Sequence, residues 1–102
     1  MSANALRGEA ELVLAGARLR LRPTFGRLVA AEAELGPLFA LVDRAADGRL
    51  SLGELAGLLW HCLDEPPSGM DRDGFGEALL AGGLAGALGP ARAVLAQALK
   101  GR

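Results

Sequence analysis

The stretch EAELVLAGARLRLR, residues 9–22, largely alternates apolar residues with charged or small ones. A period of two is typical of a β-strand that buries one face. If residues 15–16 (Ala-Gly) form a two-residue turn, Leu12 falls opposite Leu19, and the apolar side chains of both strands share one face. The sequence therefore predicts a β-hairpin with this register at the start of the fold.

The opposite face of this hairpin carries charges of opposite sign. The same register pairs Glu11 with Arg20 and Glu9 with Arg22, and each such cross-strand pair contributes roughly 0.2–1 kcal/mol. A slip of one residue would place leucines opposite charges. Two strands alone are only marginally stable, so we expect helices to cover the apolar face.

Downstream of the hairpin, apolar residues recur at helical spacing between capping and breaking residues. Thr24, Ser51 and Asp71 each precede such a segment and are suited to cap it. The clearest loop is Pro-Pro-Ser-Gly at 66–69. We expect helices over residues 25–35, 37–47, 52–65 and 71–82, then a tail over 84–100 that Gly-Pro at 89–90 divides into a short turn and a last helix.

These elements predict an α+β fold, an N-terminal β-hairpin followed by a bundle of four to five short α-helices. We expect residues 1–8 to be a flexible N-terminus and residues 9–100 to be a single domain, because 102 residues leave no room for a second core. The chain is 51% hydrophobic but only 4% aromatic. Its core is therefore expected to consist mostly of Leu, Ala and Val, with some apolar helix surface left uncovered.

Charge and cysteine content argue against several classes of protein. With a net charge of −1, the chain lacks the excess of basic residues found in proteins that bind nucleic acid or anionic membranes. No apolar run approaches the ~20 residues of a bilayer span, and the first residues lack the apolar segment of a secretory signal. The single cysteine, Cys62, cannot form an internal disulfide. We expect a soluble cytosolic protein.

The segment DRAADGRLSLGE, residues 43–54, resembles a calcium-binding EF-hand loop. Such loops carry oxygen ligands at positions 1, 3, 5, 7, 9 and 12 and glycine at position 6. The residues that match are Asp43, Asp47, Gly48, Ser51 and Glu54. A calcium-binding module that uses the four oxygen-bearing side chains is therefore the alternative function.

Three other residues of this loop oppose calcium binding. Ala45 stands at the third position, without a side-chain oxygen, and Arg44 and Arg49 bring positive charge to a site for a dication. Ser51 and Glu54 also fit the S-x-x-E capping box that begins a helix. We therefore favour a helix–turn–helix junction without a bound metal.

Trp60, His61 and Cys62 form the other conspicuous triplet. Adjacent residues of a helix point about 100° apart, so His61 and Cys62 cannot readily act as base and nucleophile. No other histidine or cysteine is present to build a zinc site. The sequence shows no convergent polar set, so we predict no catalytic residues, no cofactor and no enzyme activity.

Three segments together resemble a known family: GEAELVLAGARLRLRPTF at residues 8–25, GRLSLGELAGLLW at 48–60 and FGEALLAGGLAGAL at 75–88. Their order is similar to that of small tail proteins of the gene transfer agent family, which are grouped with phage tail assembly chaperones. The resemblance covers residues 7–100. It implies a non-enzymatic role in tail morphogenesis, in which the protein binds the long, apolar, helical tape measure protein and keeps it soluble until tail tube subunits polymerise around it.

The resemblance also implies partners. They are the tape measure protein and the tail tube protein. A homo-oligomer is a further expectation, and the net charge argues against nucleic acid or membrane as a partner. An older description of the family is tail tube protein, so residence in the particle stays open. Candidate contact residues lie on the third and fourth predicted helices: Leu58, Leu59, Trp60, Leu79 and Leu80. The alternative for each of them is a place in the core.

Overall fold

The computed structural model describes residues 9–101, so the predicted flexible segment 1–8 lies outside the described residues. The hairpin consists of β1 (Ala10–Leu14) and β2 (Ala17–Leu21), which are antiparallel. Leu12 lies opposite Leu19, which confirms the predicted register. Residues 15 and 16 turn the chain with φ angles of 50° and 80°, as a tight two-residue hairpin turn requires.

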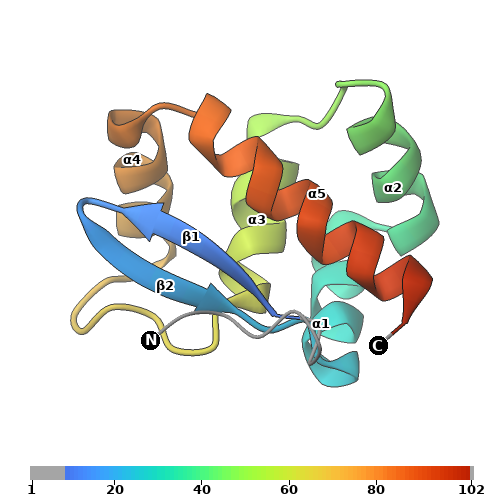
Figure 1. Ribbon diagram of the computed structural model, residues 1–102, viewed down its shortest axis with the longest axis horizontal. Helices are drawn as coiled ribbons and strands as arrows, with labels where there is room; N and C mark the ends of the chain where they lie inside the picture. Colours follow the sequence, from blue (N-terminus) through green and yellow to red (C-terminus); the bar gives the residue numbers. More distant parts are fainter. Residues whose placement is uncertain (1–8, 102) are drawn as a thin grey trace.

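Within the described residues 9–101, five helices follow the hairpin, which confirms the predicted α+β fold (Figure 1). Three of them begin with the predicted caps, because the side chains of Thr24, Ser51 and Asp71 each accept a hydrogen bond from a backbone N–H three residues later. The helices are α1 (Phe25–Leu35), α2 (Leu38–Ala46), α3 (Leu52–Cys62), α4 (Arg72–Gly82) and α5 (Ala85–Lys100).

Helix α3 lies at the centre of the fold, between α1, α4 and α5 (Figure 1). Its sequence is apolar on nearly every side, so that it packs against all of these neighbours. The inner face of the hairpin adds Leu12, Leu14 and Leu21 to the same core. The fully buried side chains with the largest volumes are Phe75, Leu12, Leu21, Leu41, Leu58, Leu59, Val94 and Cys62.

Helix α3 ends at Cys62, three residues before the predicted boundary. Leu63 instead forms a β-bridge with Leu21 of β2, and the Asp64 N–H donates to the Arg20 carbonyl over 2.9 Å. Arg20 is paired with Glu11 in the predicted register, and its guanidinium donates to the Asp64 carboxylate over 2.7 Å. Pairing with the hairpin therefore stops the helix.

The predicted break of the tail at residues 89–90 was wrong, because α5 is continuous and contains Pro90. Proline removes one helical hydrogen bond, the one that the Gly86 carbonyl would accept. Gly86 is exposed, so water can bind this carbonyl. Ala87 and Ala91 are buried and hold the helix on both sides of the proline. Tertiary packing thus outweighs the local breaking signal.

Within residues 9–101, none of the single helices has both the length and the hydropathy needed to cross a membrane. Helices α4 and α5 meet those criteria only when taken together, and they are bent by 119° with respect to each other.

Candidate partner-binding groove

An open groove of about 430 Å³ separates α3 from α4. Small residues leave the space, since α3 contributes Gly53 and Ala56 and α4 contributes Gly76. Leu52 is 50% exposed and Leu80 is 53% exposed, and both line the same groove. The result is an apolar channel between two helices that is open to solvent.

The spacing of residues along each helix explains the groove. Leu52 and Ala56 are four residues apart on α3, as are Gly76 and Leu80 on α4, so each pair lies on one helix face. A Cβ atom built on Gly76 would meet nothing within 4 Å. The floor of the groove therefore has room for the side chains of a partner.

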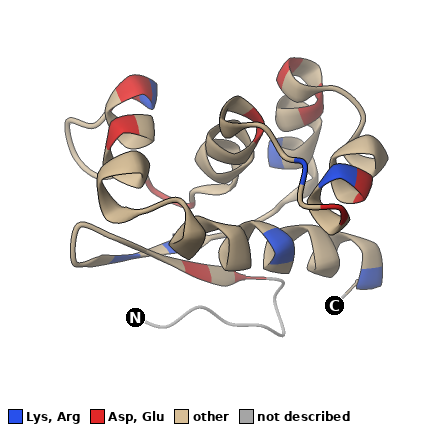
Figure 2. Cartoon of the chain, turned by 90° about the horizontal axis from the view of Figure 1, so that it is seen from above, with Lys and Arg blue, Asp and Glu red and all other residues tan. Residues whose placement is uncertain are grey.

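The charged residues of the groove are predominantly acidic. Helix α4, at the left of Figure 2, contributes Arg72, Asp73 and Glu77 to the lining. Arg72 is engaged elsewhere, because its guanidinium binds Glu34 of α1 over 2.8 Å. Asp73 and Glu77 form no ion pair with any residue between 9 and 101. They therefore leave a negative rim beside the apolar floor.

Glu34 is the centre of a three-helix polar cluster behind this rim. It accepts hydrogen bonds from Arg72 of α4 and lies 2.8 Å from Nε2 of His61 of α3. Arg72 first, and His61 second, lower the pKa of the Glu34 carboxyl to about 2. The cluster pairs the Arg72 guanidinium with Glu34, so the positive charge of this groove-lining residue is balanced by a carboxylate of α1.

The five residues predicted to contact a partner occupy different environments. Leu58, Leu59 and Leu79 are buried in the core. Trp60 is half-buried and packs on Phe75, with ring centroids 5.6 Å apart, while Leu80 lines the groove. The core alternative describes the observed place of the first three, and partner contact remains a prediction for Trp60 and Leu80.

The groove contains residues that the prediction from sequence missed. They are Leu52, Gly53, Ala56 and Gly76. The available signal was limited to α3, where the small residues Gly53 and Ala56 are three positions apart and so lie on one helix face.

Comparison with known proteins supplies a family. A family model described as "Phage tail tube protein, GTA-gp10" matches residues 7–101. The chain belongs to this family of phage and gene transfer agent tail proteins. Neither the curated proteins nor the solved structures give a match. The match confirms the resemblance to gene transfer agent tail proteins, and it supports a role of this GTA-gp10 family member in tail morphogenesis.

In this tail protein, the segment that resembles a calcium loop is the junction between α2 and α3. Glu54 Oε1 accepts from the Ser51 N–H over 2.9 Å, and Ser51 Oγ accepts from the Glu54 N–H over 3.1 Å. This is the predicted capping box. Arg44 donates to the other oxygen of Glu54. These bonds to Ser51, followed by those to Arg44, lower the pKa of Glu54.

The geometry of the loop does not favour the calcium-binding alternative. The Glu54 carboxylate is engaged by Ser51 and Arg44, and the Asp47 carboxylate binds Arg49 over 3.1 Å. Two of the four proposed ligands are thus neutralised by arginines from the loop itself. Over the described part of the chain, no group of three or more His, Cys, Asp or Glu residues is arranged to hold a metal ion.

His61 and Cys62 of the GTA-gp10 family protein have separate surroundings. The His61 ring binds Glu34, whereas Cys62 is fully buried in the core. Burial raises the pKa of the Cys62 thiol to about 12, so its reactive thiolate form is suppressed near neutral pH. His61 thus forms a hydrogen bond at the surface, and Cys62 is a packing residue of the core.

Proposed function

We propose that this protein is a non-enzymatic tail assembly chaperone that binds the tape measure protein in the bacterial cytoplasm and keeps it soluble while the tail is built. The observation that supports this proposal is the apolar groove between α3 and α4. A groove with a floor of small residues and exposed leucines accepts the apolar stripe of an amphipathic helix. Membership of the tail protein family makes a tail component the expected partner.

The charges of the groove define the partner helix further. Asp73 and Glu77 lie on the α4 side, so an incoming helix gains from Lys or Arg beside its apolar stripe. Such contacts mainly speed association and select the partner, while the apolar stripe provides most of the affinity. We infer that the bound segment is an apolar helix with basic residues on one flank.

Co-expression with fragments of the tape measure protein tests the proposal. The wild-type protein should raise the soluble fraction of an apolar helical fragment and co-purify with it. Gly76→Leu should abolish this effect, because the new side chain fills the groove. Gly26→Leu on α1 is the matched control, since a Cβ atom built on Gly26 also meets nothing within 4 Å.

Two results would contradict different parts of the proposal. If no fragment binds the wild-type protein, the chaperone function is wrong. If Gly76→Leu binds as the wild type does and unfolds at a similar temperature, the function stands but the α3–α4 groove is not the binding site.

A second candidate function is that of a tail tube component that remains in the particle. The description of the matching family, which names a tail tube protein, favours it. Mass spectrometry of purified particles distinguishes the two. A copy number comparable with that of the major tail subunit supports the tube role, and absence from the particle supports the chaperone role.

A further inference from the structure

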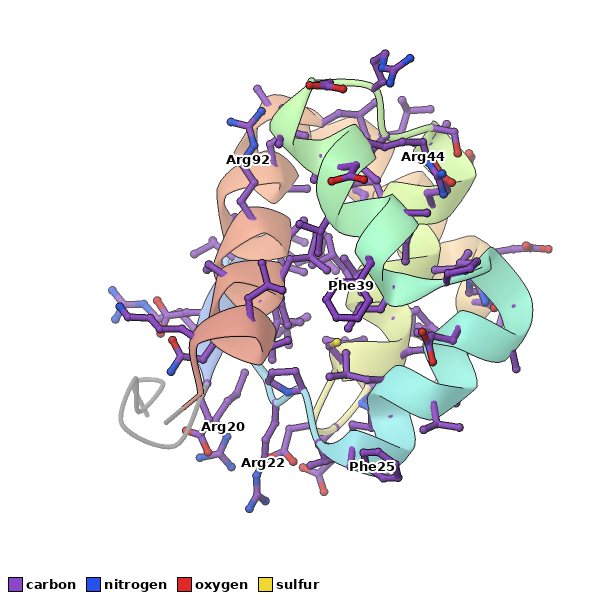
Figure 3. The ribbon with its side chains drawn as sticks, turned by 90° about the vertical axis from the view of Figure 1, so that its right-hand side faces the viewer. Arg20, Arg22, Phe25, Phe39, Arg44 and Arg92 are labelled. Carbon is purple, nitrogen blue, oxygen red and sulfur yellow. The ribbon has the colours of Figure 1, made fainter. Side chains whose placement is uncertain are left out.

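A second apolar groove lies on another face of the molecule, between α2 and α5. It has a volume of about 170 Å³, and Figure 3 shows this face with Phe39 between the two helices. The two helices run in roughly opposite directions (Figure 1), and Arg92 in the first half of α5 donates to the carbonyl of Ala45 near the end of α2. The lining residues are Val42, Ala45, Ala46, Arg92, Leu95, Ala96 and Leu99.

Two large apolar side chains beside this groove are exposed. Phe39 is 70% exposed on α2, one turn before Val42, and Leu99 is 53% exposed on α5. Since Arg92 lies beside Ala45, the antiparallel helices place Phe39 and Leu99 toward the other end of the groove. One end of the face is therefore apolar.

The other end carries an acid on one helix and a base on the other. Asp43 is exposed on α2, and Arg92 is exposed on α5. Neither forms an ion pair with another residue of the described part, 9–101. Arg92 lines the groove, and Asp43 lies one helical turn after Phe39 on the same side of α2. Thus the face carries charges of opposite sign on its two helices.

This arrangement is complementary to itself. A two-fold axis parallel to the groove lays α5 of one copy over α2 of the other. Arg92 then meets the partner's Asp43, and Phe39 meets the partner's Leu99. Each contact occurs twice, as in any two-fold interface. An axis across the groove would instead place Arg92 against the partner's Leu99.

We propose that the α2–α5 face joins two copies of this chain into a two-fold dimer. The inference is independent of the chaperone function, and it leaves the α3–α4 groove open, since α4 and α2 lie at opposite ends of the molecule (Figure 1). The occupant is a second copy because the face carries an acid, a base and two exposed apolar side chains in positions that a two-fold axis brings together in complementary pairs.

Charge exchange across the interface tests this dimer. Sedimentation velocity over a concentration series measures its Kd. Asp43→Arg alone places two arginines together, and Arg92→Asp alone places two aspartates together, so each should raise the Kd about tenfold or more. The double variant Asp43→Arg/Arg92→Asp should restore the wild-type Kd within about threefold. Arg18→Asp, an exposed reversal on the hairpin, is the matched control and should leave the Kd unchanged.

Three outcomes would overturn the proposal. The first is a wild-type protein that stays monomeric at about 200 μM, where a dimer of micromolar affinity is nearly complete. The second is a dimer that the single reversals leave intact. The third is a monomer whose Phe39→Ser variant loses a tape measure fragment that the wild type binds, which would assign this face to that partner. Thermal melting of each variant separates loss of association from loss of folding.

Discussion

Arg72 and Glu34 lie 38 residues apart in the sequence and connect α4 to α1 through two parallel hydrogen bonds. One of them joins Arg72 NH1 to Glu34 Oε1 over 2.8 Å, and His61 of α3 approaches the same oxygen at 2.8 Å. Bidentate pairing of this kind fixes geometry as well as adding energy. One carboxylate therefore sets the positions of three helices, two of which form the candidate groove.

Glu34→Gln should lower stability at neutral pH and have no effect in strong acid. The folded pKa of Glu34 is about 2, below the ordinary 4.5, so its contribution is present above about pH 4.5 and is lost as the pH falls toward 2. The side chain is 41% exposed, which limits the contribution to about 1 kcal/mol or less. Urea unfolding at intervals between pH 7 and pH 2 measures the difference between variant and wild type.

The same experiment needs a control, because other carboxyls also have a lowered pKa. Glu54 and Asp64 titrate in the acid range as well, so both proteins lose stability there. The control variant is Glu77→Gln, which removes an acid that forms no ion pair within residues 9–101. A difference between wild type and Glu34→Gln that stays constant from pH 7 to pH 2 would contradict the assignment.

The Gly57→Ala variant should be less stable than the Gly76→Ala variant, although both substitutions lie in a helix interior. A Cβ atom on Gly57 would lie 2.8 Å from Arg72 NH2 and 2.9 Å from Leu35 Cδ2, so both side chains must move. Gly76→Ala meets nothing and should gain up to about 1 kcal/mol of helix stability. We expect Gly57→Ala to fall at least about 1 kcal/mol below Gly76→Ala, because overpacking costs about 1–3 kcal/mol.

Displacement of Arg72 also has a second consequence. If Arg72 moves away from Glu34, the Gly57→Ala variant should lose part of the acid dependence that the ion pair produces. Urea unfolding of both glycine variants at pH 7 and pH 3 measures it. Equal stabilisation by the two substitutions, with the same acid dependence, would show that the side chains of Arg72 and Leu35 move aside without an energetic penalty.

The parts of the fold that follow from neighbouring residues could be predicted from the sequence. The hairpin register depends on the alternation around one tight turn, and Leu12 opposite Leu19 is its result. The helix starts depend on Thr24, Ser51 and Asp71, whose caps act within three residues. These signals are local, so they can be recognised without knowledge of the tertiary packing.

The parts of the fold that depend on contacts between distant residues could not be predicted from the sequence. Helix α3 ends where Leu63 pairs with Leu21, and α5 continues through Pro90 because its alanines are buried. The same limit applies to the groove. Helix α3 is apolar nearly all round, so only its packing against α1, α4 and α5 decides that Leu58 is buried and Leu52 is exposed.

Ser51→Ala should cost about 1 kcal/mol, because it removes the side chain that caps α3. Glu54→Gln should cost about as much or less, since it keeps an acceptor for the Ser51 N–H but weakens the bond to Arg44. Thermal melting measures both. Addition of millimolar calcium should leave the melting temperature of wild type and variants unchanged. A rise that Glu54→Gln abolishes would restore the calcium-binding alternative.

Cys62, the only cysteine of the chain, should resist thiol reagents while the protein is folded. Burial removes access to its sulfur and raises the pKa of the thiol to about 12, so the folded state holds little thiolate at pH 8. A chromogenic disulfide reagent should react with one thiol per chain in guanidinium chloride and far more slowly in buffer. Ser51→Ala, which destabilises the protein from a distance, should speed the slow reaction by about fivefold if it proceeds through global opening. Native labelling at the rate of a free cysteine would contradict the buried position of Cys62.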